Sequence, residues 1–361
     1  MPQNKNIIFT KRFWILFVML IFSIGIYLIS TEQINFSRDT VTEKITKEGP
    51  YEVDLVYLWC DGDEPQFRER KNYWLKQGNK EPDPRATSAG RFVQVDELKY
   101  SLRSVEEYLP WLRHIYIVTD RQVPIWLNTE HPNITVVDHS EIIPKQYIPV
   151  FNSNAIESVI YKIPGLTEHF LYSNDDMFVN RPLSKGFFFR DGKPIIRMRY
   201  SILNPESLYQ AQLINAITLA EHEFNSEIPF FSERNLIPHH NIDAYLKSDY
   251  ADCAHHFEKQ YQETLTHRFR KENSIQRLIV SIWSLMKDHA QVKIVPPFKK
   301  KSKKIDSIYI ANTKTDYAKR IDRQNPGLFC LNDSEFSTPE DRLRVKTFLE
   351  SRFPKKSKFE K

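Results

Sequence analysis

The sequence predicts an α/β fold built around a mostly parallel sheet. Four apolar runs have the length and composition of buried strands: Val53–Trp59, Ile115–Thr119, Ile134–Val137 and Phe170–Tyr172. Between the first two runs, apolar residues recur at the spacing of a buried helix face: Leu98, Leu102, Val105 and Leu109. Strands that alternate with helices favour a parallel sheet, because a helix returns the chain to the edge where the next strand begins.

The first fifty residues form a separate region. Phe13–Ser30 is an uncharged run of 18 residues. As a helix it would be about 27 Å long, close to the thickness of a bilayer's hydrocarbon core. We expect residues 1–12 to be a tail, 13–30 a transmembrane helix and 31–50 a stem. A cleaved signal peptide is the alternative, but no Ala-x-Ala site follows the run. Basic residues on both sides leave its orientation open.

The remaining residues, 51–361, are predicted to form one domain. The stretch from about 208 to 290 shows helical spacing instead of strand alternation, for example at Ile275, Leu278, Ile279, Ile282 and Leu285. We therefore expect a helical subdomain packed over the sheet.

Composition excludes several classes of protein. The formal net charge of +5 is small, and no basic motif with interleaved aromatic residues occurs, so no nucleic-acid partner is expected. The cysteines, Cys60, Cys253 and Cys330, show no Cys-x-x-Cys spacing. This argues against a zinc site and against a disulfide scaffold.

Three polar residues, Asn174, Asp175 and Asp176, directly follow the last predicted strand. In a parallel sheet this position lies at the carboxyl edge, where ligands usually bind. Two adjacent carboxylates repel each other unless a positive charge compensates, and Mg²⁺ or Mn²⁺ prefers such oxygen ligands. The alternative is that the Asp pair only caps a turn or a helix.

Four separated blocks of the chain resemble the Stealth family of sugar-phosphate transferases: Asp54–Asp63, Arg91–Phe189, His239–Met286 and Phe329–Phe359. That family includes bacterial capsular polysaccharide phosphotransferases and the animal enzyme that places N-acetylglucosamine 1-phosphate on lysosomal glycoproteins. The resemblance implies a glycosyltransferase A-like sheet that binds a nucleotide-sugar. The chain departs from the family pattern at Gln94 and Val95, where Asp-Asn is usual, and at Lys99, where Arg is usual.

The resemblance also implies roles for individual residues. Asp175 and Asp176 would hold Mg²⁺ or Mn²⁺, and Arg270 would bind the transferred phosphoryl group in a bidentate manner. His240 would accept the proton of the acceptor hydroxyl, with His239 as the alternative, because the spacing to Arg270 favours His240. The remaining implied residues are catalytic or bind the donor: Asp54 and Glu157 in the first group, and Asp61, Asn174, Asn332 and Asp333 in the second.

The predicted function is therefore that of a membrane-anchored, metal-dependent transferase. Residues 51–361 would move a hexose or N-acetylhexosamine 1-phosphate from a nucleotide-sugar to a hydroxyl of a glycan or polysaccharide. A bacterial inner membrane and capsule or surface-polysaccharide biosynthesis are favoured, and a Golgi-type secretory membrane is the alternative. Two other functions stay open: an ordinary metal-dependent glycosyltransferase, and a non-catalytic membrane protein that binds glycans.

Overall fold

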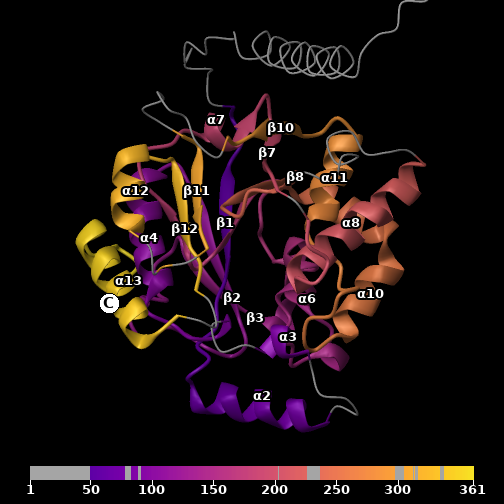
Figure 1. Ribbon diagram of the computed structural model, residues 1–361, viewed down its shortest axis with the longest axis horizontal. Helices are drawn as coiled ribbons and strands as arrows, with labels where there is room; N and C mark the ends of the chain where they lie inside the picture. The colour runs from indigo at the N-terminus through magenta and orange to yellow at the C-terminus, as the bar shows by residue number, and fades with distance from the viewer. Residues whose placement is uncertain are drawn as a thin grey trace, which may run out of the picture. The chain divides into compact units, whose positions relative to one another are not determined.

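A five-stranded mixed sheet lies at the centre of the computed structural model, with its strands in the order β3-β2-β1-β4-β9 (Figure 1). Its strands are β1 (Val53–Leu58), β2 (His114–Thr119), β3 (Ile134–Asp138), β4 (His169–Asn174) and β9 (Asp243–Leu246). The first four pair in parallel, and β9 runs antiparallel to β4. The prediction of an α/β fold is confirmed, and the four predicted apolar runs all form strands of this sheet.

The structure describes residues 49–77, 83–87, 91–201, 203–225, 236–296, 305–311, 313, 316–333 and 337–361. These residues belong to one compact unit, which spans 48–361. The predicted transmembrane helix at 13–30, the tail and most of the stem lie outside the described residues. Within the ranges given above, no helix is both long and apolar enough to cross a membrane.

Both faces of the central sheet are covered, which explains why its strands are apolar throughout. On one face, Leu55 and Tyr57 of β1 pack against Leu102 of helix α4 (Glu97–Tyr108). On the other face, Val56 and Tyr172 pack against helices from the second half of the chain. Complete burial of such side chains stabilises the fold by roughly 1.5–3 kcal/mol each. The predicted helix between β1 and β2 is therefore present, and its apolar residues contact the sheet as expected.

The helices on the second face include four from the region predicted to be helical: α8 (Leu208–Phe224), α9 (Lys247–His256), α10 (Glu258–Thr266) and α11 (Leu278–Met286). That region also contains two short strands, β8 (Leu236–Pro238) and β9, so the expectation that it lacks strands was wrong there. Strands of three and four residues are too short to show a periodic pattern in sequence. Their positions are fixed by pairing with β7 and β4.

Two smaller sheets complete the fold. One contains β10 (Gln291–Ile294), β7 (Lys193–Tyr200) and β6 (Phe189–Arg190), with β8 paired to β7. The other contains β11 (Ser307–Ile310), β12 (Leu328–Leu331) and β5 (Met177–Val179), and it lies on the same side of the central strands as α4, α12 (Tyr317–Gln324) and α13 (Pro339–Arg352) (Figure 1). The remaining elements are short or peripheral helices: α2 (Pro65–Gln77), α3 (Pro84–Thr87), α5 (His139–Ile142), η2 (Lys145–Tyr147), α6 (Ser153–Glu157), η3 (Ile160–Lys162) and α7 (Lys185–Phe188).

Candidate active site

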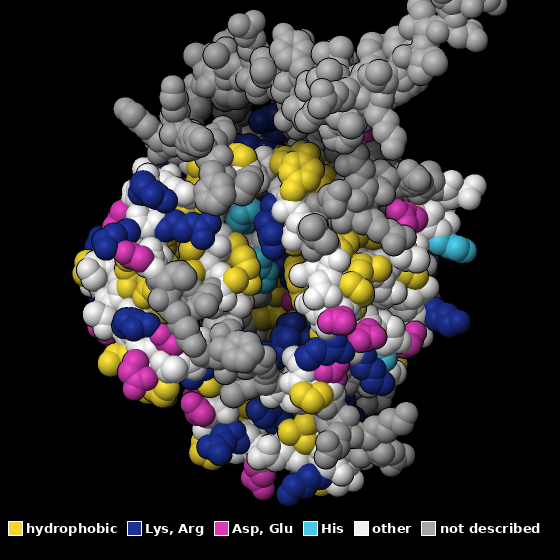
Figure 2. Space-filling view, viewed as in Figure 1, with side chains coloured by type: hydrophobic (Ala, Val, Ile, Leu, Met, Phe, Trp, Pro, Cys, Tyr) yellow, Lys and Arg dark blue, Asp and Glu magenta, His cyan; other side chains and the backbone are white. Residues whose placement is uncertain are grey.

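A cavity of about 770 Å³ opens at the carboxyl ends of the parallel strands. Trp59, Asp120, His139 and Asn174, which follow or end β1, β2, β3 and β4, all line it. The other lining residues include Arg199, Ile237 and Tyr309 of the smaller sheets, the start of α8, and Arg270 in the segment after α10. Figure 2 shows the hollow with histidine and basic side chains gathered along it. The cavity therefore joins segments that are far apart in the chain, from Leu58 to Asp333.

The acidic triplet lies in the turn that joins β4 to β5. Asp175 accepts a hydrogen bond of 2.9 Å from Gln94 Nε2, and Gln94 in turn accepts one of 3.1 Å from Trp59 Nε1. Asp176 Oδ2 accepts a hydrogen bond of 3.3 Å from the Cys330 thiol. Among the described residues, the buried Oδ1 of Asp176 has no hydrogen-bond partner. The triplet therefore has too few donors to satisfy its negative charge.

Electrostatic repulsion is concentrated at this corner of the cavity. Desolvation, and then the charge of Asp175, raise the pKa of Asp176 to about 7. Desolvation and the same neighbour raise the pKa of Glu97, at the start of α4, to about 8. Three carboxyl groups that disfavour one another's ionisation form a pocket in which a bound cation would be stabilised.

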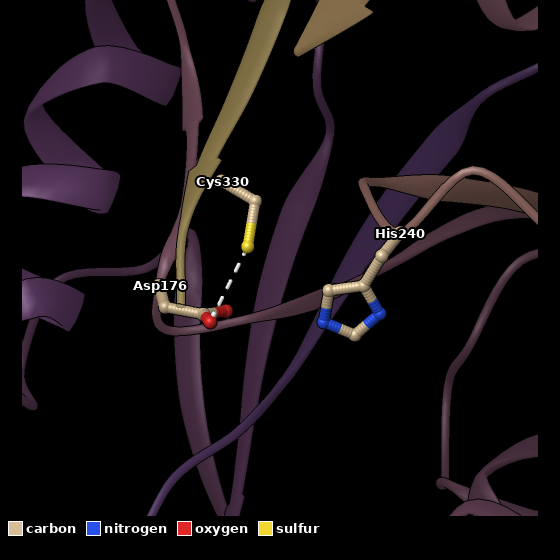
Figure 3. A group of neighbouring side chains, drawn as sticks. All are labelled: Asp176, His240 and Cys330. Carbon is tan, nitrogen blue, oxygen red and sulfur yellow. Dashed lines mark hydrogen bonds between the residues drawn. The ribbon is translucent and has the colours of Figure 1, made fainter. Parts of the chain in front are cut away.

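Asp176, His240 and Cys330 form a compact group in this corner. One potential ligand atom of each lies within 4.8 Å of the other two. Figure 3 shows the His240 ring facing Asp176 and Cys330 from the opposite side of the gap. Burial, and then the Asp176 charge, raise the pKa of Cys330, so the sulfur keeps its proton and acts as a hydrogen-bond donor. The three side chains are of metal-ligating types and lie close enough to share an ion, although the thiol would first have to lose its proton, and the prediction of a metal site is supported to that extent without the identity of the ion.

The two adjacent histidines lie in different surroundings. His239 is buried, and its Nδ1 lies 3.0 Å from the Ser307 hydroxyl, away from the cavity lining. His240 lines the cavity, with its ring centroid 5.4 Å from that of Tyr309. Desolvation, and then the charge of Arg277, lower the pKa of His240 to about 3. His240 is therefore uncharged at neutral pH.

Arg270 lines the cavity, whereas Glu157 lies behind its wall. Arg270 Nη2 donates a hydrogen bond to the Ser153 hydroxyl. Glu157 accepts a hydrogen bond of 3.2 Å from Arg277 and one of 3.0 Å from the Tyr172 hydroxyl. That hydroxyl also lies 2.9 Å from Asn174 Oδ1. Glu157 thus contacts the triplet through Tyr172, in a position suited to orienting Asn174.

The other predicted site residues divide into two groups. Asn332 and Asp333 line the cavity, and Asp333 accepts a hydrogen bond of 2.8 Å from Arg342. Asp61 caps its own turn by accepting a hydrogen bond of 2.9 Å from the Asp63 backbone and is outside the lining. Asp54 lies at the amino end of β1, the opposite edge of the sheet. The structure therefore does not bring Asp54 or Asp61 together with the triplet.

The structure adds four residues that the sequence analysis did not predict as part of the site: Gln94, Glu97, Arg199 and Cys330. Gln94, Glu97 and Cys330 lie in blocks that resemble the Stealth family, Arg91–Phe189 and Phe329–Phe359, so their position was a usable signal. The cysteine spacing gave none, because a cysteine that joins a mixed group leaves no Cys-x-x-Cys pattern.

Comparison with known proteins identifies the class to which this chain belongs. Residues 91–196 match Stealth protein CR2, conserved region 2, and residues 319–361 match Stealth protein CR4, conserved region 4. The capsular polysaccharide phosphotransferase fcs1 of Haemophilus influenzae is 32% identical over 304 residues, 80% of each chain. The exopolysaccharide phosphotransferase cps2G of Lactiplantibacillus plantarum is 31% identical over 348 residues, 87% of this chain and 97% of its own length. The chain belongs to the Stealth family.

These relatives confirm the predictions of the family and of a phosphotransferase enzyme of capsule or exopolysaccharide synthesis. Among solved structures, the galactosyltransferase LgtC with donor and acceptor sugar analogs is similar at a TM-score of 0.38. It is 13% identical, and the match covers 82% of this chain and 95% of that one. This similarity is too distant to carry an argument about function.

The position of Asp54 leads to a first prediction. Its buried carboxylate accepts hydrogen bonds of 2.8 and 2.5 Å from Arg113 and one of 2.9 Å from the Thr167 backbone. Asp54→Asn should lower the free energy of unfolding by roughly 1.5–3 kcal/mol, because two charged donors lose an anionic acceptor. We expect a loss near the lower end of this range, because Arg113 is 34% exposed and solvent screens its charge. Turnover per folded molecule should stay close to that of the wild type.

Glu52→Gln is the matched control, because Glu52 pairs with the same Arg113 at 3.7 Å but is 68% exposed. Chemical denaturation should detect no change for this variant. A loss of turnover in Asp54→Asn with unchanged stability would instead place Asp54 in the reaction.

Proposed function

We propose that this protein transfers a hexose or N-acetylhexosamine 1-phosphate from a nucleotide-sugar to a hydroxyl of a glycan, in capsule or exopolysaccharide synthesis. The observation that carries the proposal is the arrangement around His240. An uncharged histidine faces Asp176 across a cavity that also contains Arg270, in a chain whose relatives are named phosphotransferases. Phosphoryl transfer needs these three elements: a proton acceptor, a site for a cation and a guanidinium group.

The proposed reaction exchanges one phosphorus–oxygen bond for another. The acceptor hydroxyl oxygen attacks the phosphorus that carries the sugar, and the bond from this phosphorus to the nucleoside monophosphate breaks. A ring nitrogen of His240 takes the hydroxyl proton, and the electron pair of the broken bond leaves on the nucleoside monophosphate. Arg270 binds oxygens of the transferred phosphoryl group, where its planar guanidinium can make two parallel hydrogen bonds. The product is a phosphodiester between sugar and glycan.

Asp175 and Asp176 fit a divalent cation, for which Mg²⁺ or Mn²⁺ is our choice. The unpartnered Oδ1 of Asp176 and the raised pKa of both aspartates are the features that a bound cation would relieve. Carboxylate oxygens are the preferred ligands of these ions, and the protonated Cys330 thiol is a poor one. When bound, the ion would neutralise charge on the diphosphate of the donor.

The donor-binding and membrane roles complete the proposal. Asn174, Asn332 and Asp333 line the cavity beside the triplet and would contact the donor, while Glu157 would hold Asn174 in place through Tyr172. Asp61, which caps its own turn, would support this end of β1.

The apolar run at 13–30 would anchor the enzyme in a membrane, for which we favour the bacterial inner membrane. That last part rests on the sequence and on the capsule-related names of the relatives.

The bond that is broken provides the central test. If the proposal holds, turnover of a nucleoside-diphosphate sugar releases the nucleoside monophosphate and leaves phosphorus in the glycan. Nucleotide chromatography and phosphorus NMR of the product measure both outcomes. Release of the nucleoside diphosphate, with a glycan free of phosphorus, would show an ordinary glycosyltransferase instead.

The cation gives a third prediction. Chelation should abolish turnover, and Mg²⁺ or Mn²⁺ should restore it. Asp176→Asn should lower turnover by about a hundredfold or more, because it removes an electrostatic contribution where charge develops. Titration of the purified protein with Mn²⁺, followed by electron paramagnetic resonance, should show weaker binding to this variant.

Asp288→Asn serves as the control, because Asp288 is 91% exposed, pairs with Lys193 and is outside the cavity lining. It should bind Mn²⁺ and turn over like the wild type. Full activity of demetallated wild-type protein in chelator would contradict the assignment of a cation to this site.

The choice between the histidines gives a fourth prediction. His240→Ala should lower turnover by about a hundredfold to ten-thousandfold, because the proton acceptor is lost. Its thermal stability should change little, since the ring faces the cavity. His239→Gln should instead lower the melting temperature, because it disturbs the buried contact with Ser307, while retaining most of the turnover. Steady-state rates and thermal melts of both variants measure the difference, and an active His240→Ala beside an inactive His239→Gln would move the base to His239.

A further inference from the structure

Four arginines line the cavity within the described part of the chain: Arg85, Arg91, Arg199 and Arg270. Three of them have protein partners. Arg85 pairs with Asp83 and, at 2.9 Å, with Glu272. Arg91 donates a hydrogen bond of 2.8 Å to the Arg85 backbone oxygen, and Arg270 donates one to the Ser153 hydroxyl.

Arg199 is different from the other three. Its Nε is buried and has no hydrogen-bond partner among the described residues. Its guanidinium carbon lies 6.0 Å from the centroid of the Tyr309 ring. A guanidinium presents five N–H donors in a fixed plane, and a donor withdrawn from water without an acceptor is unfavourable. An anion in the cavity would supply the acceptor that the protein does not.

Arg199 lies close to His240 in the fold. Arg199 pairs with Ile237 across β7 and β8, and the chain reaches His240 three residues later. The rings of Tyr309 and His240 are 5.4 Å apart, and Tyr309 lies beside Cys330 in the register of β11 and β12. Arg199 and His240 therefore contact the same aromatic ring, and His240 faces Asp176 across the gap.

We propose that Arg199 binds phosphoryl oxygens of the donor diphosphate and is a further substrate-binding residue of this enzyme. The nature of the anion rests on the proposed function: His240 must reach the hydroxyl that attacks phosphorus, so the phosphoryl group lies next to His240 and hence next to Arg199. Together with Arg270, Arg199 supplies a second guanidinium to the wall that faces the cation site. Tyr309 holds the guanidinium plane in place before the substrate binds.

The test uses the full-length chain with inorganic pyrophosphate as the probe, in the presence of Mg²⁺. Isothermal titration calorimetry should show that Arg199→Gln binds pyrophosphate about tenfold to a hundredfold more weakly than the wild type, as expected for the loss of charged hydrogen bonds. Its melting temperature should be unchanged, because no hydrogen bond within the described part of the protein is lost. Arg199→Lys, which keeps the charge but not the planar fork, should recover part of the affinity.

Arg190→Gln is the matched control, since Arg190 is an exposed arginine on β6 outside the cavity lining. It should bind pyrophosphate with wild-type affinity. In turnover assays, Arg199→Gln should raise the KM for the donor or lower kcat, with the KM for the acceptor unchanged.

Two results would overturn the proposal. One is wild-type pyrophosphate affinity in Arg199→Gln. The other is a melting temperature that falls in step with activity while pyrophosphate binding is retained, which would assign Arg199 a structural role. The outcome is independent of the bond that is broken: weaker pyrophosphate binding in Arg199→Gln would uphold the site even if product analysis showed release of a nucleoside diphosphate.

Discussion

Three carboxyl groups, those of Glu97, Asp175 and Asp176, share one corner of the cavity, where each disfavours the ionisation of its neighbours. The surrounding structure limits this repulsion without removing it. Gln94 donates to Asp175, and the Cys330 thiol donates to Asp176, yet one oxygen of Asp176 is left without a donor among the described residues. The fold thus tolerates these carboxyl groups, but their negative charge is not fully compensated by hydrogen-bond donors. Uncompensated carboxylates of this kind favour the binding of a cation.

The sheets determine which groups meet at this corner. β4 carries the triplet to the carboxyl edge of the central sheet, and β5 then pairs with β12, which places Cys330 opposite Met177 and next to Asp176. β8 pairs with β7 and delivers His240 to the other side of the gap. Backbone pairing therefore fixes the positions of side chains from three distant segments before any substrate binds.

Sequence reasoning located the central strands and α4 because each is long enough to show its period, as Leu98, Leu102 and Val105 do. For the two histidines it had only the spacing to Arg270, which favours His240, because the surroundings that distinguish His239 from His240 come from the neighbouring strands. That Asp54 lies far from the site could have been predicted from the sequence. It stands at the first residues of β1, and only the last residues of parallel strands reach the ligand edge. β8 and β9 are too short to show a periodic pattern in the sequence, so only their pairing with β7 and β4 identifies them as strands.

Some arginines of this protein are paired with a carboxylate and others are not. The first group stabilises the fold, and the second has a positive charge available for a ligand. Arg113, Arg197 and Arg277 each pair with a carboxylate: Asp54, Asp306 and, for Arg277, both Glu157 and Asp243. Because a buried charge that loses its partner is costly, these pairs hold the fold together. Among the described residues, Arg270 has a hydroxyl partner and no carboxylate, and Arg199 has an aromatic ring. A guanidinium without a carboxylate keeps its charge available, and both of these arginines line the cavity that also contains the carboxylates of the triplet, where a phosphoryl group would be transferred.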